Sequence, residues 1–453
     1  MQDLELPIGF RSEIIGPLLQ VLAAGESSSL VGVGSAGKSN IVRHLIRRDV
    51  LQAHLGDAAR SVLVLYIDCQ KLADYTAQAL HSLILEELPR AAQLAGSEVA
   101  LLSPNLATLW EQAAGAGSPD RVRHVLEESV AAVLQAGIQQ LFILLDDFDP
   151  VVQQAPARVL NSLRALRDQY KSQIVYVTVT RRELAFLRNE NEYQDFYELV
   201  TAATFAIGPY REDDATFMID RLSSRWNLPR RLGDAEIQRV LELSGRHPGL
   251  ILALLRALRH DEKLSLIAPD SHEQLARHPD VEPECAKIWE SLEKEETADL
   301  ITLVSQGWPI GAGIRPLERK GLIRKRLDDT YDVFSPIFVE FVWDNLPDGR
   351  YAIKFVPEQR EVGLHGRVIQ LADETEFRLF STLFEQRPKA VAREELIRSM
   401  VETEPTPRRF PGPPDQRLES YLAELKHKID SIRQAFILAE PDGSYRLIGS
   451  EGQ

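Results

Sequence analysis

Hydrophobic residues in the first half of the chain fall into short β-branched runs separated by longer amphipathic segments. The short runs are apolar at nearly every position, which is typical of strands buried on both faces of a parallel sheet. The amphipathic segments between them have a helical period. We therefore predict an α/β domain over residues 1–208, with strands at Ser29–Val33, Ser61–Ile67, Leu141–Leu145, Ile174–Thr180 and Thr204–Ile207.

The second half of the chain has a different pattern. Three amphipathic stretches between Arg211 and Arg259 predict helices, and a polar segment rich in proline and histidine follows, so we assign residues 209–284 to a helical region and linker. Helices followed by an alternating, wing-like segment then occur twice, at residues 285–348 and 351–453. We predict two C-terminal modules of one general design.

Composition narrows the class of protein. The 453 residues are 44% hydrophobic and 26% charged, as in ordinary globular proteins. With 52 lysines and arginines against 67 acids, the net charge is −15. This argues against a nonspecific nucleic-acid coat or a polybasic membrane binder, although one local face can still bind DNA.

Cysteines and hydropathy indicate the compartment. Cys69 and Cys285 lie far apart, which excludes a disulfide scaffold and a cysteine zinc site, and the histidines show no metal-binding motif. No segment approaches the roughly 20 apolar residues that span a bilayer. Asp3 and Glu5 stand where a signal peptide carries positive charge. We expect a cytoplasmic protein with no membrane partner.

The strongest motif lies between the first predicted strand and the helix after it. Residues Gly32 to Ser39 fit GxxxxGK[ST], the phosphate-binding loop or Walker A motif. Its glycines let backbone N–H groups face phosphates, Lys38 reaches the β- and γ-phosphates, and Ser39 ligates Mg²⁺. The residues predicted to bind the nucleotide here are Gly32, Gly34, Ser35, Ala36, Gly37, Lys38, Ser39 and Asn40.

A second strand supplies the acids that such a site needs. The apolar run Leu141–Leu145 ends in Asp146 and Asp147. We expect Asp146 to hold Mg²⁺ and Asp147 to orient or deprotonate the attacking water. Arg181, at the end of the next strand, can sense the γ-phosphate or can be a solvated strand terminus. Lys38, Asp146, Asp147 and Arg181 are the predicted catalytic residues.

With these motifs in place, the chain resembles the STAND branch of the AAA+-related P-loop ATPases over about residues 1–345. Gly9–Glu13 is similar to that branch's adenine-pocket motif, which implies nucleotide contacts for Phe10 and Arg11. Gly245–Gly249 resembles the Gly-x-Pro element of its helical lid, whose proline, here Pro248, packs near adenine. The resemblance implies a winged helix at 285–348, an ATP/ADP·Mg²⁺ switch and a homo-oligomer on activation.

One residue of the acidic strand departs from the fast AAA+ motors. Asp147 is shorter by one methylene than their glutamate, which favours a slow, regulatory ATPase. Origin-recognition initiators and transposition ATPases share much of this architecture. The predicted fold class is therefore an α/β P-loop NTPase with a parallel sheet and a helical lid, followed by two winged-helix domains.

Residues 360–449 resemble the OmpR/PhoB-type winged-helix DNA-binding domain. Its first-helix pattern is present at Glu376–Leu383, and Asp442–Leu447 is similar to its Gly-x-Gly-Tyr-Arg wing, with Ser444 replacing the second glycine. The resemblance implies DNA contacts by Arg417, Lys426, His427, Lys428 and Arg446. Residues 352–453 carry 15 basic and 17 acidic residues, however, whereas DNA-binding domains usually have a basic excess. A winged helix that docks protein is the alternative.

Three hypotheses for function follow. The first is an ATP-controlled transcriptional regulator with a C-terminal DNA-binding module. The second is a DNA-remodelling or loading AAA+ ATPase of the replication-initiation or transposition type. The third is a protein-interaction switch in a defence or assembly complex, which the acidic charge favours over the second. The sequence names neither the activating ligand nor a DNA target.

Overall fold

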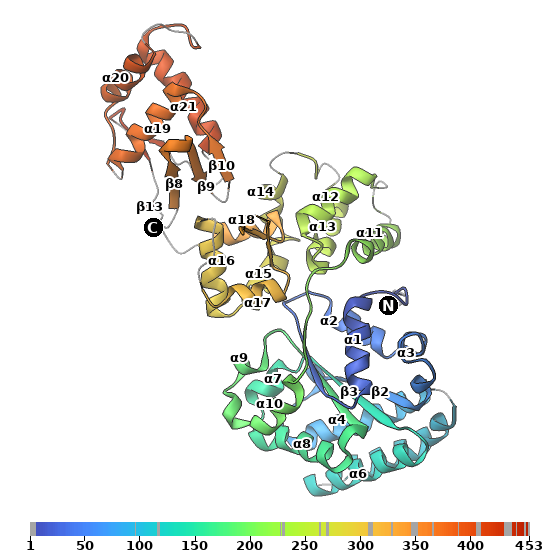
Figure 1. The fold of residues 1–453 in the computed structure, drawn as a ribbon. Helices are drawn as coiled ribbons and strands as arrows, with labels where there is room; N and C mark the ends of the chain where they lie inside the picture. The colour runs from blue at the N-terminus through green and yellow to red at the C-terminus, as the bar shows by residue number, and fades with distance from the viewer. Residues whose placement is uncertain are drawn as a thin grey trace. The chain divides into compact units, whose positions relative to one another are not determined.

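The fold was analysed in a computed structural model of the whole chain, shown in Figure 1. The structure describes residues 6–95, 97–115, 118–226, 228, 232–261, 264–268, 271–306, 311–327, 329–345, 352–364, 367–387, 389–404, 409–429, 437–440, 442–447 and 450–451. Contacts divide the chain into two compact units. The first comprises Met1–Ile267, Pro279–Glu293 and Arg319–Leu322, and the second comprises Ala268–His278, Lys294–Glu318 and Ile323–Gln453.

A parallel sheet forms the centre of the first unit. All five strands predicted from the sequence are present, in the spatial order β2-β3-β4-β1-β5. Their bounds are β1 Ser28–Val31, β2 Val62–Asp68, β3 Gln140–Asp146, β4 Ile174–Thr180 and β5 Thr204–Ala206. Because β4 pairs with both β1 and β3, it separates the strand before the phosphate loop from the acidic strand.

Burial explains why these segments form strands. Every residue of β1 and β4 is buried, and β3 is buried from Leu141 onward. A strand with apolar side chains on both faces is stable only when helices cover both faces. The near-continuous apolar runs in the sequence therefore correspond to the central strands.

Helices cover the sheet on two sides. Figure 1 shows α1 and α3 on one side and α4, α6 and α8 on the other. The chain moves from β1 out to β2 and then back through β3 and β4, so right-handed crossovers place the helices on opposite faces. These helices are α1 Ser12–Ala23, α2 Lys38–Leu45, α3 Arg48–Leu55, α4 Ala77–Ala95, α5 Ser103–Ala114, α6 Pro119–Gln135, α7 Asp149–Gln154, α8 Ala157–Tyr170, α9 Leu184–Leu187 and α10 Gln194–Thr201. Short 3₁₀ turns lie at η1 Gly56–Ser61, η2 Cys69–Lys71, η3 Ser97–Leu102, η4 Lys171–Gln173 and η5 Glu190–Glu192.

The predicted helical region completes the first unit. It contains α11 Glu212–Trp226, α12 Asp234–Ser244 and α13 Pro248–His260. The helix α15, Glu282–Glu290, also belongs to this unit and packs on α13. Ligands of open α/β sheets bind at the carboxyl ends of the strands, and the loops at that edge carry the candidate site.

The second unit contains the C-terminal helices and hairpins. Its elements are α14 Ser271–Ala276, α16 Lys294–Gln306, α17 Ile314–Arg319, β6 Ile323–Lys325, β7 Tyr331–Val333, α18 Pro336–Asp344, β8 Ala352–Val356, η6 Pro357–Gln359, β9 Glu361–Leu364, β10 Arg367–Gln370, α19 Glu374–Gln386, α20 Arg393–Thr403, α21 Pro414–Ile429, β11 Ile437–Ala439, β12 Tyr445–Leu447 and β13 Ser450–Glu451. The strands form two antiparallel hairpins, β6–β7 and β11–β12, and a sheet ordered β10-β9-β8-β13. Apolar faces of α19, α20 and α21 share one core with these last strands.

The predicted domain boundaries do not coincide with the two units. Within the predicted module 285–348, contacts place the residues up to Glu293 and Arg319–Leu322 in the first unit and the rest in the second. Within the predicted region 209–284, Ala268–His278 lies in the second unit. The assignment of two winged helices stays a prediction. Among the helices that the structure describes, none has the length and hydropathy that crossing a membrane requires.

Candidate nucleotide site

Backbone conformation shapes the loop between β1 and α2. Ser35 and Gly37 are left-handed, with φ of 57° and 86° respectively, and Ala36 between them is not. Alternating hand turns successive N–H groups toward one side, which builds an anion-binding nest at the positive end of a helix. A Cβ at Gly37 would lie only 3.2 Å from the Tyr210 hydroxyl. The loop thus has the shape that phosphate binding requires.

Lys38 lies folded against this loop. Its Nζ donates hydrogen bonds to the carbonyls of Gly32 (2.7 Å) and Val33 (3.0 Å), and the residue is 8% exposed. Burial lowers the pKa of Lys38 to about 8, although Asp149 and the two aspartates of the acidic strand oppose the shift. A buried ammonium of this kind is attracted to any phosphate that enters the loop.

The residues predicted to hold Mg²⁺ come together. Asp146, at the end of β3, accepts hydrogen bonds from the Tyr66 hydroxyl (3.2 Å), the Asp147 N–H (3.0 Å) and the Ser39 side chain. Burial raises the pKa of Asp146, and the nearby Asp147 carboxylate raises it further. An all-oxygen pair of a hydroxyl and a carboxylate suits Mg²⁺, whose charge would favour the ionised form of Asp146.

Asp147 faces the cavity and has a partner that the sequence did not reveal. Its φ of 50° is left-handed, and its carboxylate accepts a hydrogen bond from the Gln70 side chain at 2.7 Å. Asp147 and Gln70 both line the cavity. A carboxylate and an amide side by side can orient a water molecule.

The end of β4 is held by a third aspartate. The Arg181 N–H donates to both carboxylate oxygens of Asp149, at 2.9 and 3.2 Å, and burial raises the pKa of that carboxyl. The Arg181 side chain lines the cavity beside Lys38. Arg181 therefore lies in the cavity with the phosphate-loop residues, and its contact with a phosphate stays a prediction.

Phe10 and Arg11 lie one layer behind the cavity. Phe10 is buried and packs edge-on against Tyr210, with the ring centroids 5.3 Å apart. The Arg11 guanidinium donates to the carbonyls of Pro209 (2.7 Å) and Gly208 (2.9 Å). Neither residue lines the cavity, whereas Tyr210 does. Their place in the structure is to position the segment that carries Tyr210.

The first turn of α13 packs on the phosphate loop. Pro248 begins the helix, and its Cγ lies 3.5 Å from the position of a Cβ on Gly37. The Gly249 N–H donates to the Ser35 carbonyl at 3.2 Å. The buried His247 precedes the helix, and burial lowers the pKa of its imidazole to about 3. Pro248 thus lies against the phosphate loop and lines the cavity, and its packing against adenine stays a prediction.

These residues enclose a cavity of about 540 Å³. Its floor is the phosphate loop, and its polar and apolar walls come from different elements. The lining residues are Gly34, Ser35, Ala36, Gly37, Lys38, Ser39, Asn40, Gln70, Asp147, Arg181, Tyr210, Met218, Leu222, Pro248, Gly249, Ile251, Leu252 and Lys287. Lys38, Arg181 and Lys287 supply positive charge, and side chains of α11 and α13 form an apolar wall. The phosphates of a nucleotide need the positive charge, and its base needs the apolar wall.

The segment Lys287–Glu293 closes one side of the phosphate loop. The Ser291 hydroxyl accepts a hydrogen bond from the Gly34 N–H at 2.9 Å and donates one to the Lys287 carbonyl at 2.6 Å. A Cβ on Gly34 would lie 2.6 Å from that carbonyl oxygen, so only glycine allows this approach. We call Lys287–Glu293 the closing segment.

The end of β4 holds the same segment. The Arg182 guanidinium donates to the Glu290 carbonyl at 2.7 Å and lies 3.4 Å from the Glu293 carboxylate. The closing segment is therefore fixed at two points, by the phosphate loop and by the residue after Arg181. Sequence analysis missed this contact because the segment is more than a hundred residues from β4.

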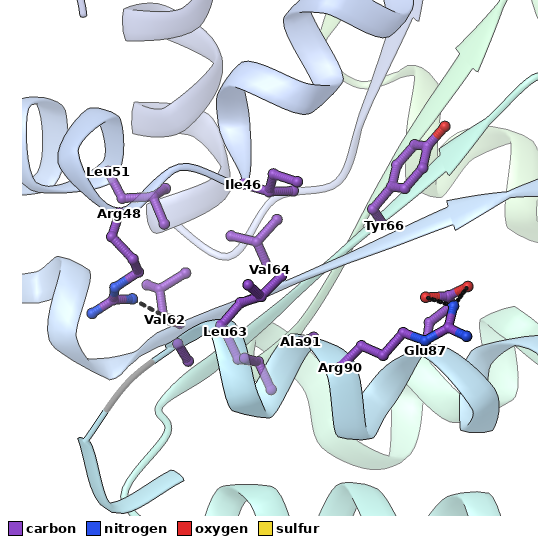
Figure 2. Close-up of a pocket in the computed structure, with 12 residues that line it drawn as sticks. Ile46, Arg48, Leu51, Val62, Leu63, Val64, Tyr66, Glu87, Arg90 and Ala91 are labelled. Atoms are coloured by element: carbon purple, nitrogen blue, oxygen red, sulfur yellow. Dashed lines mark hydrogen bonds and ion pairs between the residues drawn. The ribbon is translucent and has the colours of Figure 1, made fainter. Parts of the chain in front are cut away.

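A smaller cavity of about 150 Å³ lies at the edge strand β2, where residues of β2, α3 and α4 line it (Figure 2). Its walls are mostly apolar, and the Glu87–Arg90 ion pair (3.1 Å) lies at its margin. None of its lining residues belongs to the phosphate loop or the acidic strand. It is separate from the nucleotide site.

One predicted DNA contact proves to be a core residue. Arg417 is 3% exposed, and its guanidinium donates to the Glu404 carbonyl and carboxylate, both at 2.8 Å. The Tyr421 hydroxyl donates to the same carboxylate at 2.8 Å. The prediction took Arg417 for a surface residue because the helical period alone does not show where a buried acid lies.

The other predicted DNA contacts are described by the structure on or beside α21. Lys428 pairs with the Glu376 carboxylate at 2.5 Å, and Arg446 pairs with Glu440 at 2.9 Å. Lys426 lies 5.5 Å from the centre of the Tyr445 ring, and His427 is exposed. Acidic side chains thus neutralise the charge of two of these four residues, Lys428 and Arg446.

Comparisons with known proteins give structural neighbours at low identity. No protein-family profile matches the chain, and no curated protein matches its sequence. A Walker-type ATPase of Pyrococcus abyssi is 15% identical, with a TM-score of 0.45, over 75% of this chain and 99% of that one. The ORC2 protein of Aeropyrum pernix, solved in ADPNP and ADP complexes, is 13% identical, with a TM-score of 0.39, over 74% and 93%. The ORC1 protein of the same organism, solved in complex with DNA, is 14% identical, with a TM-score of 0.37, over 97% and 90%.

These neighbours are similar to this chain only at TM-scores below 0.5. The class of protein follows from the chain itself. A parallel α/β sheet carries a phosphate loop after β1 and an Asp-Asp pair at the end of β3, and the loop and Asp147 line one cavity. The fold is an α/β fold of the P-loop NTPase type.

Proposed function

We propose that this protein is an ATP-binding and slowly ATP-hydrolysing switch whose closing segment responds to the nucleotide. One observation carries the proposal: the Gly34 N–H in the phosphate loop and Arg182 after β4 both bond to Lys287–Glu293. A γ-phosphate would lie between these two elements. Its arrival therefore competes with the contacts that hold the segment.

The chain's own residues would divide the chemistry as follows. Lys38 and the loop amides bind the phosphates, and Ser39 and Asp146 hold Mg²⁺, which supplies charge neutralisation. Asp147, supported by Gln70, orients the attacking water, and Arg181 stabilises charge that develops on the γ-phosphate. Asp147 is a short base, so we expect slow turnover. Tyr210, Pro248 and the apolar side chains of α11 and α13 that line the cavity would hold the adenine ring.

The switching step needs a difference in affinity between two conformations. A ligand shifts an equilibrium only as far as it binds one state better than the other. We propose that ATP attracts Arg182 away from Glu290 and Glu293, and that ADP leaves these contacts in place. The closing segment is then released by ATP and retained with ADP.

The output of the switch is proposed to be the C-terminal unit. The helices α19, α20 and α21 followed by the hairpin β11–β12 have the order of a winged helix. DNA is the first partner to test, either as a regulator's specific site or as the substrate of a loading ATPase of the ORC type. We propose ATP-dependent self-assembly in both cases.

A protein-docking output is the second candidate, and ion pairs of α21 and of the hairpin β11–β12 favour it. Arg417 is buried, and Lys428 and Arg446 are paired with acids. A lysine or arginine that must first break an ion pair with a carboxylate contributes less binding free energy to a DNA phosphate than an unpaired one does. These pairs support a protein partner over direct sequence reading by α21.

The nucleotide part is tested by calorimetric titration of the purified chain with ATP and ADP in Mg²⁺. We expect micromolar binding that Lys38→Ala abolishes and a slow turnover that Asp146→Asn removes. Equal binding by wild type and Lys38→Ala would overturn the proposed site.

The output is tested with the same protein. Enrichment of one genomic sequence supports the regulator, duplex-stimulated turnover with ATP-dependent assembly supports the loading ATPase, and neither result supports the protein-docking switch. Light scattering with ATP or ADP reports the assembly. Lys38→Ala is the control, because its output should no longer respond to ATP.

A further inference from the structure

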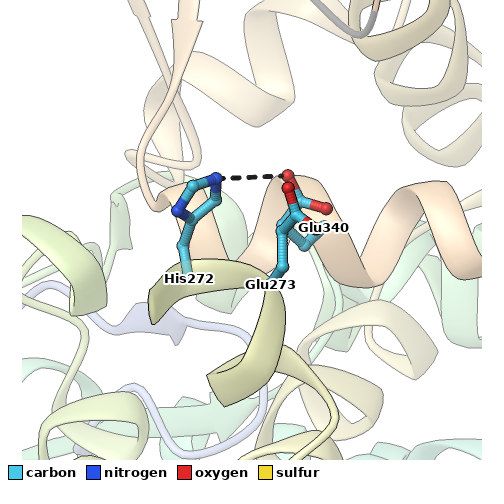
Figure 3. Close-up of side chains that lie close together, drawn as sticks. All are labelled: His272, Glu273 and Glu340. Carbon is cyan, nitrogen blue, oxygen red and sulfur yellow. Dashed lines mark ion pairs between the residues drawn. The ribbon is translucent and has the colours of Figure 1, made fainter. Parts of the chain in front are cut away.

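A group of potential metal ligands lies in the second unit and shares no residue with the sites discussed above. His272 and Glu273 come from the short helix α14, and Glu340 comes from α18 (Figure 3). Their ligand atoms all lie within 4.8 Å of one another. The glutamates are 5% and 8% exposed, and the side chain of His272 is 13% exposed.

The spacing of these atoms suits a transition-metal ion. The His272 Nε2 lies 3.6 Å from the Glu340 carboxylate oxygen. Two ligands that each lie about 2 Å from a tetrahedral ion are roughly 3.3 Å from one another. The imidazole and the two carboxylates therefore need only small side-chain rotations to meet at one point.

Charge supports the same conclusion. Two carboxylates at this distance in a buried setting repel one another, and a divalent cation between them would relieve that repulsion while binding the neutral imidazole. The Arg277–Asp344 ion pair, at 3.5 Å, links the residue after α14 to the last residue of α18.

We propose that His272, Glu273 and Glu340 form a site for a divalent transition-metal ion that binds Zn²⁺ more tightly than Mn²⁺ or Fe²⁺. One nitrogen and two oxygen ligands suit zinc, manganese or ferrous iron, and affinity rises from manganese to zinc for such a set. The ion would clip α14 to α18. This site is distinct from the Mg²⁺ site and does not depend on the proposed function.

Sequence reasoning does not find this group because its spacing fits no motif. His272 and Glu273 are adjacent, whereas helical metal motifs place ligands three or four residues apart. Glu340 follows much later in the chain, on a helix that packs against α14.

The test is calorimetric titration of the metal-free full chain with Zn²⁺ alone, in the absence of nucleotide. The matched variants are His272→Asn and Glu340→Gln, which keep similar shapes. Asp146→Asn controls for metal binding at the phosphate site. We expect one Zn²⁺ per chain in wild type and in Asp146→Asn, at least tenfold weaker binding in the other two variants, and weaker binding of Mn²⁺ than of Zn²⁺.

Two further readouts keep the test decisive if a variant folds poorly. Circular dichroism checks each variant, and Co²⁺ bound to wild type should give the intense visible bands of a tetrahedral nitrogen and oxygen site. No stoichiometric Zn²⁺ binding by wild type would overturn the proposal. So would equal Zn²⁺ affinity in wild type, His272→Asn and Glu340→Gln when all three are folded.

Discussion

Substitution of Gly34 tests the contact between the phosphate loop and the closing segment. Gly34 is not left-handed, so alanine is compatible with its backbone. The added Cβ would lie 2.6 Å from the Lys287 carbonyl oxygen and 2.9 Å from the Lys287 carbonyl carbon and Cβ. Because two of these three atoms are backbone, no side-chain rotation relieves the overlap, and the closing segment must move.

The magnitude follows from two contributions. Overpacking costs about 1–3 kcal/mol, and loss of the Gly34–Ser291 hydrogen bond costs about 1 kcal/mol. At the lower limit of their sum, about 2 kcal/mol, release of the closing segment becomes roughly 30-fold easier, since every 1.4 kcal/mol is tenfold. The free energy of global unfolding should change by no more than the same amount.

The assay is hydrogen exchange of the amides of residues 287–293 in the nucleotide-free protein. Gly34→Ala should accelerate their exchange about 30-fold, while α4 and α6 keep wild-type rates. Gly115→Ala is the matched control, because its φ is −80° and the nearest atom to an added Cβ is 3.6 Å away. Unchanged exchange in a folded Gly34→Ala protein would refute the reasoning.

Three further predictions concern charge. Burial lowers the pKa of Lys38 to about 8, so the empty site loses its ammonium above that pH. The dissociation constant for ATP, measured by calorimetry, should therefore rise up to about tenfold per pH unit above pH 8. In the Lys38→Arg variant the dissociation constant should not depend on pH over the same range. The Asp146→Asn variant should still bind ATP, but its Mg²⁺-dependent rate of phosphate release should fall by about 100-fold or more. A near-normal rate would exclude the role assigned to Asp146 as a metal ligand. Arg417→Ala removes the cation from the buried Glu404 carboxylate and should destabilise the second unit by about 3–5 kcal/mol in urea unfolding. Adding Glu404→Gln to Arg417→Ala should restore part of the lost stability. A stable Arg417→Ala protein with weakened DNA binding would show instead that Arg417 is a surface DNA contact.

The sequence predicts the sheet well and locates the loop between β1 and α2 because both depend on local pattern. Apolar runs identify buried strands, and the glycines and Lys38 need only a strand before them and a helix after them. Pro248 is found through its lid motif. It lies against the loop at Gly37 in the structure.

Contacts between distant segments are what the sequence could not supply. Gln70 reaches Asp147 from the end of another strand, and Ser291 reaches Gly34 across more than two hundred residues. Neither serine nor glutamine has a motif that signals such a partner. The same holds for Arg417, whose apparent place on a helix face conceals its contact with Glu404.

The central claim is that ATP releases the closing segment and ADP does not. The most direct measurement is hydrogen exchange of residues 287–293 in the full chain, saturated with Mg²⁺ and either ADP or a non-hydrolysable ATP analogue. The account predicts faster exchange with the ATP analogue than with ADP, and no difference in Lys38→Ala. Equal protection in both nucleotide states of the wild-type protein, with binding of both nucleotides verified, would contradict it.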